Sequence, residues 1–280
     1  MPRYLTSTFN CNDMKYLLLT FDLEQFVVPI ERKIAYNVEE LFRVSYNGTH
    51  KIIKLLDKHQ ITSTFFTTYE YALKYPSLIE KIIENNHEIA LHGYSHLHNY
   101  KTMTERNAFR YLKEAKFCLE KKFNITIKGF RAPRLAAPTT SLLKRLGFIY
   151  DSSLHPTFVP GRYFNLLKQR NVFRDNIWEV PISVTPLRFP FSWFWFKNFG
   201  LTYSKLCTVA HLRSSDYVNI YFHPWEFEDV NLNRILPDLS LRNNGVKLLK
   251  ILNKYVEWTK IKELKATAIC NYLNTNFFQN

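Results

Sequence analysis

Glycine and closely spaced cysteines are scarce in this sequence. There are only 7 glycines in 280 residues and no Gly/Ser-rich or proline-rich linker, which argues against two loosely joined domains. The four cysteines lie far apart, without a Cys-x-x-Cys pair, at Cys11, Cys118, Cys207 and Cys270. This spacing excludes a zinc ribbon and a dense disulfide framework.

Long hydrophobic runs are also missing. No apolar run approaches the roughly 20 residues that span a bilayer, and the first residues do not form a charged segment followed by an apolar one. We therefore expect a cytoplasmic protein with reduced cysteines, and neither a transmembrane helix nor a secretory signal.

Hydrophobic and aromatic residues are plentiful, at 46% and 16% of the chain. This content supplies a large packed core, and α/β barrels of about 250 residues commonly fold as one unit. We predict a single domain over residues 1–280, with a core from about residue 15 to about residue 270.

The formal charge is +14, from 38 basic and 24 acidic residues. Such a surface favours anionic partners, which include phosphates, nucleic acids and acidic membrane surfaces. The lysines are spread along amphipathic segments, so a solvated basic surface explains the charge equally well. Because no recognisable DNA- or RNA-binding motif is present, we predict no nucleic-acid partner.

Strand and helix patterns alternate along the chain. Apolar or β-branched runs predict strands at residues 16–21, 61–67, 87–92, 125–130, 148–150, 178–182, 218–222 and 265–269. Helical patterns begin at residues 48 and 75 and cover residues 104–123, 139–146 and 241–258. Residues 25–47 have no strong period and are expected to form a loop. The alternation predicts βα units and a mainly parallel sheet.

Polar residues suited to catalysis follow several of these strands. They are Asp22, His92, His96, Arg131 and His223. Because the carboxyl ends of parallel strands face one edge of the sheet, we expect these side chains to meet. Two histidines four residues apart suit a catalytic zinc, which usually takes a third protein ligand and leaves a position for water. Each signal alone is weak, since a histidine at a strand end is more often structural.

Four motifs occur in order: Thr20-Phe21-Asp22, His92-Gly-Tyr-Ser-His96, Gly129-Phe130-Arg131-Ala132-Pro133 and Phe222-His223-Pro224. Together they resemble the motifs of the polysaccharide deacetylase, or NodB-homology, family of metal-dependent carbohydrate esterases, over about residues 16–225. The resemblance implies an α/β fold, an irregular (β/α) barrel of the NodB-homology or glycoside hydrolase/deacetylase type with mainly parallel strands.

The resemblance also implies a mechanism. A divalent metal, first of all Zn²⁺, would be held by His92 and His96, would polarise an amide carbonyl and would lower the pKa of a bound water. Asp22 would be the general base, with Arg131 holding it in place and ionised. His223 would be the general acid that protonates the leaving amine.

One departure from the family pattern concerns the third metal ligand. The usual first motif has two adjacent aspartates, whereas the second position here is Leu23, which cannot bind a metal. A subgroup of relatives has Asp-x-Asp/Glu, which Asp22-Leu23-Glu24 resembles, so Glu24 is the predicted third ligand. The alternative is a catalytically impaired protein on the same fold that binds a glycan or a lipid.

Other residues complete the predicted site. The backbone N–H of Arg134 is expected to help stabilise the oxyanion. Glu179 or Asp151 is a candidate to orient His223, although a structural hydrogen-bonding role is the preferred interpretation of both. The remaining candidate substrate-binding residues are Tyr94, Trp225 and Glu226, for which packing roles are the alternative.

The strongly aromatic segment 189–199 has three interpretations. Buried packing is the first, and a stacking wall for sugar rings is the second. The third is contact with an anionic membrane surface, which the positive charge of the chain supports.

The expected activity is removal of an acetyl or similar acyl group from an N-acylated amino sugar during assembly of a surface glycan or glycolipid. With membrane contact, the substrate would be a lipid-linked glycan at the inner face of the membrane.

Overall fold

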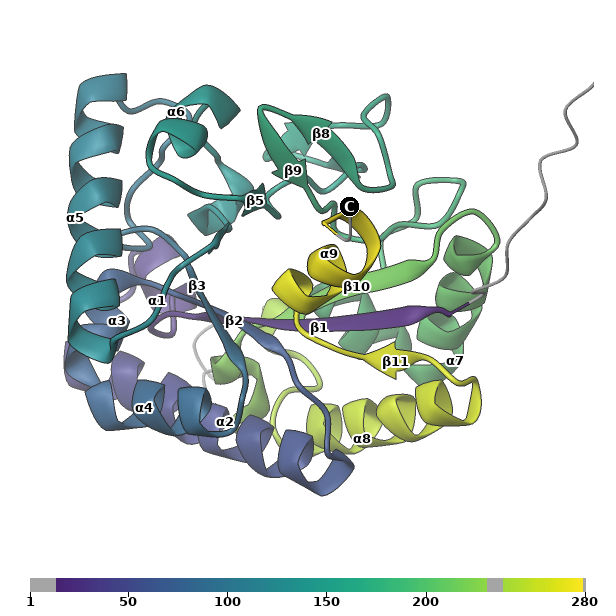
Figure 1. Ribbon diagram of the computed structural model, residues 1–280. Coiled ribbons are helices and arrows are strands. Elements are labelled where there is room, and N and C mark those ends of the chain that lie inside the picture. The colour runs from purple at the N-terminus through teal and green to yellow at the C-terminus, as the bar shows by residue number, and fades with distance from the viewer. Residues whose placement is uncertain (1–13, 231–238, 279–280) are drawn as a thin grey trace, which may run out of the picture.

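The computed structural model describes residues 14–230 and 239–278, whose centre is a curled sheet (Figure 1). Its strand order is β10-β1-β2-β3-β4-β5-β9-β8, and β11 pairs with β1. The strands are β1 (Tyr16–Leu23), β2 (Thr64–Thr67), β3 (Glu88–Leu91), β4 (Gly129–Phe130), β5 (Tyr150–Asp151), β8 (Phe173–Asp175), β9 (Ile177–Glu179), β10 (Tyr217–Phe222) and β11 (Lys265–Ala266). A separate hairpin pairs β6 (Phe158–Val159) with β7 (Tyr163–Phe164).

All pairings in the main sheet are parallel except that of β8 with β9. Every residue of the central strand β1 is buried. A strand covered on both faces needs apolar residues at successive positions, which explains its continuous hydrophobic run. The expected parallel sheet is therefore confirmed.

The sheet curls until the segment after β9 reaches β10. The backbone N–H of Ser183 donates to the carbonyl of Asn219 at 2.9 Å, and the Asn219 N–H donates to Ser183 Oγ at 2.8 Å. The Asn219 side-chain amide also donates to the carbonyls of Val180 and Pro181, at 3.1 and 3.2 Å. These contacts close the ring without a regular strand pairing, so the predicted irregular (β/α) barrel is confirmed.

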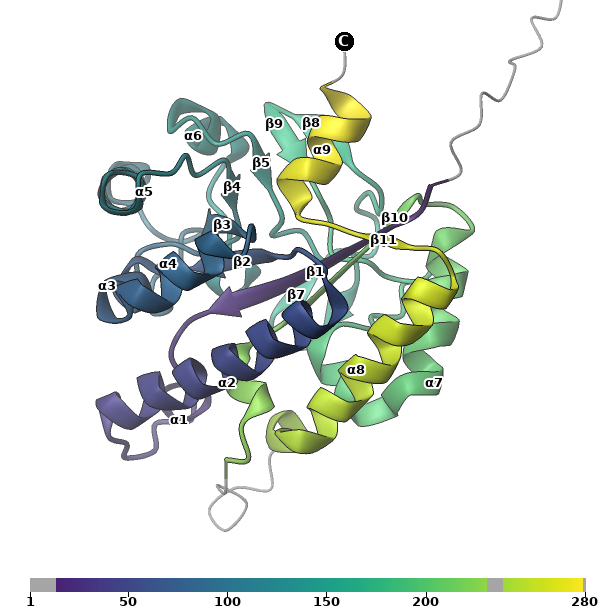
Figure 2. The same cartoon turned by 60° about the horizontal axis from the view of Figure 1, so that its bottom comes forward.

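Helices cover the outside of this barrel (Figure 2). They are α1 (Val28–Glu31), α2 (Val38–His59), α3 (Tyr69–Lys74), α4 (Pro76–Glu84), α5 (Glu105–Phe123), α6 (Thr140–Arg145), α7 (Trp193–Leu212), α8 (Val246–Ile261) and α9 (Ile269–Phe277). The buried faces of α2 to α8 and one face of the sheet form a large hydrophobic cluster, whereas α9 packs in a second cluster with residues such as Leu18 and Phe66. In the part of the chain that the structure describes, no helix has the length and hydropathy that crossing a membrane requires.

The loop expected at residues 25–47 is wrong in part, because α1 and most of the first half of α2 lie there. The α2 helix begins where Asn37 Oδ1 accepts a hydrogen bond from the Glu39 N–H at 2.9 Å, a typical N-cap. Its first turn is exposed, and burial begins at Leu41. The polar first turn conceals the helical period in the sequence.

Three further helices, α3, α7 and α9, were not predicted. The first turns of α7 carry consecutive aromatic residues, so they show no polar face, and Gly200 interrupts the helix with φ +78°. At the C-terminus, the strand expected over residues 265–269 stops after two residues, because Ile269 begins α9 and donates its N–H to Thr64 Oγ1 at 2.9 Å.

Candidate active site

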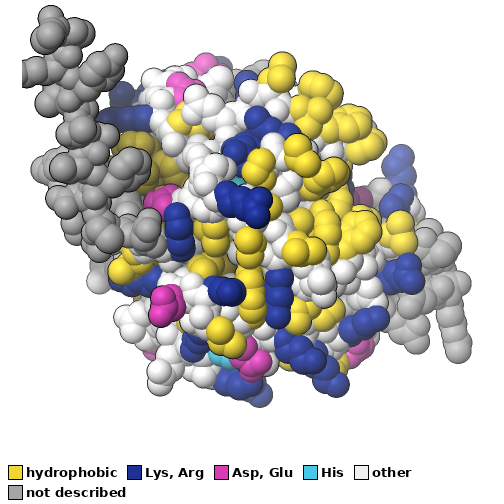
Figure 3. Space-filling model, turned by 90° about the vertical axis from the view of Figure 1, so that its right-hand side faces the viewer, with side chains coloured by type: hydrophobic (Ala, Val, Ile, Leu, Met, Phe, Trp, Pro, Cys, Tyr) yellow, Lys and Arg dark blue, Asp and Glu magenta, His cyan; other side chains and the backbone are white. Residues whose placement is uncertain are grey.

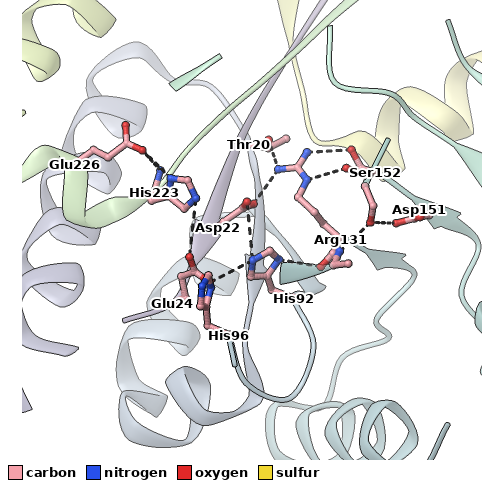
Figure 4. Close-up of polar contacts among 12 residues, drawn as sticks. Thr20, Asp22, Glu24, His92, His96, Arg131, Asp151, Ser152, His223 and Glu226 are labelled. Carbon is pink, nitrogen blue, oxygen red and sulfur yellow. Dashed lines mark hydrogen bonds and ion pairs between the residues drawn. The ribbon is translucent and has the colours of Figure 1, made fainter. Parts of the chain in front are cut away.

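The carboxyl ends of the strands bring the predicted polar residues together, as Figure 4 shows. Strand β1 supplies an aspartate, and the segment after it supplies a second carboxylate. The loop after β3 supplies two imidazoles. The segment after β4 supplies an arginine, and the segment after β10 supplies a third imidazole. These residues are Asp22, Glu24, His92, His96, Arg131 and His223. Except for His223, whose side chain is 14% exposed, all of them are buried.

Arg131 holds Asp22 in a fixed position. Its Nη1 donates to Asp22 Oδ1 at 2.9 Å and to Thr20 Oγ1 at 2.8 Å. Its Nε and Nη2 donate to the carbonyl and hydroxyl of Ser152, at 3.0 and 2.9 Å. The guanidinium also lies 4.1 Å from the centre of the Phe66 ring. A fully buried guanidinium with this many partners has one available orientation, so its carboxylate partner is positioned as well.

Glu24 lies at the centre of the three imidazoles. Its Oε2 is 2.5 Å from His96 Nδ1 and 3.4 Å from His92 Nε2, and its Oε1 is 3.9 Å from His223 Nε2. Burial by itself raises the pKa of this carboxyl, but the charges and hydrogen bonds of His96 and His92 outweigh it and hold the pKa well below the ordinary value. Glu24 is therefore a buried carboxylate anion.

His92 has a defined tautomer. Its Nδ1 lies 2.8 Å from the carbonyl oxygen of Arg131, which can only accept, so Nδ1 carries the proton. In the neutral imidazole, Nε2 then carries a lone pair directed at Glu24 and the cavity. A ring held this way by a backbone carbonyl is a typical metal ligand.

His96 lies between two carboxylates. Besides its contact with Glu24, its Nε2 is 3.3 Å from Oε1 of Glu31. Burial lowers the pKa of His96, but the charge of Glu24 and the hydrogen bonds raise it to about 9. The hydrogen bond from His96 in turn lowers the pKa of Glu31 to about 2. The sequence did not indicate Glu31, because it lies at the end of the short helix α1, where a loop was expected.

The donor set of Glu24, His92 and His96 has the chemistry of a zinc site. The 3.4 Å between Glu24 Oε2 and His92 Nε2 matches two ligands of a tetrahedral zinc, which are about 3.3 Å apart. Glu24 and His96, in contrast, are at hydrogen-bond distance. Within residues 14–230 and 239–278, no group of three or more His, Cys, Asp or Glu side chains has the spacing of a formed metal site. A metal would have to separate this pair by roughly 1 Å.

His223 is oriented by Glu226, whereas the candidates from the sequence were Glu179 and Asp151. Its Nδ1 lies 2.7 Å from Glu226 Oε1, and the Trp225 ring stacks on the imidazole with centres 5.3 Å apart. Burial lowers the pKa of His223, but the hydrogen bond and charge of Glu226 raise it above the ordinary value overall. Glu226 is fully buried, so its predicted role in binding substrate is corrected to a positioning role. Its spacing of three residues from the histidine was the available sequence signal.

The other two candidates for orienting His223 lie elsewhere. Asp151 accepts a hydrogen bond from Ser153 Oγ at 2.5 Å, and Glu179 accepts one from the Leu154 N–H at 2.9 Å. Burial raises the pKa of Asp151 to about 6 and that of Glu179 well above its ordinary value. These contacts agree with the structural interpretation that the sequence favoured for both.

The site opens into a cavity of about 580 Å³, a volume within the range of small-molecule sites. Its polar floor includes Asp22, Glu24 and His223. Aromatic and basic residues form its walls, namely Tyr163, Trp193, Phe194, Trp195, Tyr221, Trp225, Arg32, Arg134 and Arg162. Tyr94 is not among the described lining residues, because its ring packs against Tyr69, His98 and Tyr111. Its predicted contact with substrate therefore has no support in the structure.

The protein is a mainly parallel α/β barrel. Carboxylates, imidazoles and an arginine at its strand ends form a buried site suited to acid–base chemistry. A family model described as polysaccharide deacetylase matches residues 10–150, half of the chain. The chain belongs to this family.

Two curated relatives share a limited segment. The chain is 33% identical over 114 residues to a peptidoglycan deacetylase-like protein of Gibberella zeae, which is 38% of this chain and 32% of that protein. It is 28% identical over 116 residues to a peptidoglycan deacetylase of Helicobacter pylori, which is 40% of this chain and 39% of that one. The chain thus spans about a third of the length of the curated relatives it matches.

Solved structures share the fold over nearly the whole chain. A protein of Pseudomonas aeruginosa described as a polysaccharide deacetylase has a TM-score of 0.66 at 14% identity and covers 95% of this chain and 93% of its own. An allantoinase has a TM-score of 0.64 at 16% identity, with 95% and 92% covered. A CE4-family pseudoenzyme of Bacillus anthracis has a TM-score of 0.56 at 13% identity, with 93% and 66% covered. At these identities, the likeness shows the fold.

Proposed function

We propose that this protein is a metal-dependent deacetylase that removes an N-acetyl or similar acyl group from an amino sugar in a polysaccharide or glycolipid precursor. The observation that carries the proposal is that three groups reach one cavity: Asp22, which is held by Arg131, the cluster around Glu24, and His223. Amide hydrolysis needs a base for the attacking water and an acid for the leaving amine, and this arrangement offers both.

Glu24, His92 and His96 are the residues that would hold the divalent metal, with zinc the first choice for this donor set. When bound, the metal polarises the amide carbonyl and lowers the pKa of the attacking water. The chain holds the His92 ring in place through the carbonyl of Arg131, and Glu31 accepts a hydrogen bond from the far side of His96. Such contacts hold imidazole ligands in the orientation that a metal needs.

Asp22 is the proposed general base. One of its oxygens is bound to Arg131, while its Oδ2 lies 4.0 Å from His92 Nε2, on the side of the proposed ligands. An oxygen in this position is able to take the proton of a water that attacks the substrate beside His92. The hydrogen bond from Arg131 fixes the orientation of the carboxyl group.

His223 is the proposed general acid. Glu226 holds its Nδ1, so that Nε2 is the nitrogen on the side of Glu24. Because the pKa of His223 is raised, the ring keeps its proton to higher pH and can give it to the leaving amine. The backbone N–H of Arg134, at the cavity wall, is the proposed donor to the oxyanion.

The alternative is an impaired protein that binds a glycan or lipid without hydrolysing it. The hydrogen bond between Glu24 and His96 favours this alternative, because it occupies the position where both would bind a metal. Leu23 supports it as well, because the resemblance to the usual first motif of the family implies a metal-binding aspartate at this position. Binding of an N-acetylated sugar without release of acetate would distinguish this function from catalysis.

Peripheral contact with an anionic membrane belongs to the proposal, with a lipid-linked glycan as the substrate form. Segment 189–199 has side chains in three environments: Phe196 is buried, Trp193 lines the cavity, and Phe189 and Phe199 are 57% and 62% exposed. Figure 3 shows hydrophobic side chains interspersed with Lys and Arg on the face of the molecule where α7 lies. Aromatic residues mixed with cations favour anionic bilayers. Flotation with phosphatidylglycerol vesicles tests this contact, and the cytoplasmic location stays a prediction.

Metal content and acetate release test the function together. We expect near-stoichiometric zinc in the wild type after zinc loading, loss of zinc in His92→Ala and Glu24→Ala, and release of acetate from N-acetylated oligosaccharides by the wild type. Asp22→Asn, which leaves the proposed ligands intact, should keep the zinc and lose the activity. A wild type that takes up no zinc, cobalt or nickel would overturn the proposal.

A further inference from the structure

Two arginines from distant segments meet at the mouth of the cavity. Arg134 Nε lies 3.2 Å from Glu31 Oε1, and Arg162 Nη2 lies 3.4 Å from Glu31 Oε2. Arg134 follows β4, whereas Arg162 is in the turn between β6 and β7. Arg32 lines the same mouth. We call Arg32, Arg134 and Arg162 the arginine rim.

The mouth of the cavity carries more positive than negative charge. Deeper in the cavity, each carboxylate has a cationic or imidazole partner: Asp22 is bound by Arg131, and Glu24 by His96. At the mouth, Glu31 pairs with both Arg134 and Arg162, and Arg32 also lines the cavity. The side chains of Arg134 and Arg162 are 33% and 49% exposed, so a ligand entering the cavity is able to reach them.

The rim lies next to the proposed reaction centre. Glu31 Oε1 contacts both Arg134 Nε and His96 Nε2, at 3.2 and 3.3 Å, so a single carboxylate oxygen separates the guanidinium from a proposed metal ligand. A group bound by Arg134 therefore belongs to the reacting sugar or to a substituent attached directly to it. A group several sugar units away along the glycan would lie too far from Arg134.

Arginine is the side chain best suited to a planar or tetrahedral anion, since its guanidinium forms paired hydrogen bonds with carboxylate and phosphate. The cavity also has an aromatic wall at Trp193, Trp195 and Trp225, which suits the apolar face of a pyranose ring. Anion-binding and sugar-binding surfaces thus lie within one cavity.

We propose that the arginine rim binds a phosphate or carboxylate group of the reacting amino sugar, so that the substrate class is an anionic N-acylated amino sugar and not a neutral glycan. This inference rests on the proposed function for the identity of the sugar. The anion takes over the contacts that Glu31 now makes with Arg134 and Arg162.

Tryptophan fluorescence of the full chain measures binding without requiring turnover, because three of its five tryptophans line the cavity. The probes are N-acetylglucosamine, N-acetylglucosamine 1-phosphate and N-acetylmuramic acid, which are neutral, phosphorylated and carboxylated forms of one sugar. We expect one or both anionic probes to bind at least about tenfold more tightly than the neutral sugar. Preference for one anion over the other identifies phosphate or carboxylate as the recognised group.

Variants locate the effect. Arg134→Gln and Arg162→Gln should each reduce the preference for the anionic probes over the neutral sugar, and the double variant should abolish that preference. Arg145→Gln is the matched control, because Arg145 pairs with Glu105 on the surface and does not line the cavity. Equal affinity of the wild type for all three probes would overturn the inference, as would a preference that survives in the double variant.

Acetate release separates this inference from the proposed function. If the anionic probes bind tightly but neither they nor oligosaccharides release acetate, the rim's role in binding stands and the hydrolase proposal fails. If acetate is released from neutral oligosaccharides and the three probes bind equally, the hydrolase proposal stands and the inference fails.

Discussion

Replacing Glu226 with glutamine tests whether this residue orients and charges the general acid. The carboxylate is fully buried and lies 2.7 Å from His223 Nδ1. Glutamine keeps the shape and still accepts a hydrogen bond, but it removes the negative charge. A hydrogen bond to a charged group contributes about 1.5–3 kcal/mol, so the loss corresponds to roughly a 10- to 100-fold decrease in kcat.

The pH profile gives a sharper result than the rate. Because Glu226 raises the pKa of His223, the protonated acid persists to higher pH in the wild type. A general acid is active below its pKa, and its contribution is lost as the pH rises through that pKa. Glu226→Gln lowers the pKa, so the alkaline decrease in kcat should move to lower pH. The assay is acetate release measured from pH 5 to pH 10.

Glu179→Gln is the matched control, since Glu179 is a buried carboxyl that does not contact His223. In Glu179→Gln, the decrease in kcat at alkaline pH should occur at the same pH as in the wild type. An unchanged alkaline limb in Glu226→Gln, or an equal shift in Glu179→Gln, would refute the assignment. Circular dichroism must show that both variants are folded, because Glu226 also lies 3.7 Å from the buried Lys197 amine.

Three further changes test the geometry of the site. Arg131→Lys keeps the charge but loses the fork of hydrogen bonds, so we expect about 2–4 kcal/mol less stability in urea unfolding and at least about 100-fold lower kcat. Glu31→Gln removes the carboxylate behind His96 and should weaken zinc binding by about 10- to 100-fold in chelator competition, whereas exposed Glu39→Gln should not. In Gly48→Ala, the new Cβ would lie 1.8 Å from the Pro224 carbonyl oxygen, so we expect about 1–3 kcal/mol of destabilisation, measured by thermal unfolding.

Each of these expectations has a contrary result. A lysine variant with wild-type stability would show that the guanidinium contacts contribute little. Zinc affinity that is equal in Glu31→Gln and the wild type would show that Glu31 does not position His96. A Gly48→Ala protein as stable as the wild type would show that α2 and the Pro224–Phe227 turn do not pack as closely as the structure has them.

The residues at strand ends could be predicted because the physical reason is local. The apolar run of β1 indicates a buried strand, and a polar residue such as Asp22 within a run buried on both faces indicates a site. Parallel strands place their carboxyl ends on one edge, so His92, Arg131 and His223 had to lie near Asp22 once the sheet was recognised. Because His96 follows His92 by only four residues, the second imidazole lies near the first.

The contacts of Glu226 were within reach of the sequence but were missed. His223 and Glu226 are three residues apart in one tight turn, so their pairing is local. The α7 helix was missed for a different reason, since consecutive aromatic side chains leave no polar face by which the period can be recognised.

The sequence by itself indicated the alternation of strands and helices, the polar residues at the strand ends and the donor types of the candidate metal site. Only the tertiary structure decided that Asn219 closes the barrel and that Glu31 joins His96 to Arg134 and Arg162. Those partners are separated from Glu31 by 65, 103 and 131 residues. The docking of such distant loops depends on packing over the whole barrel, which no local pattern encodes.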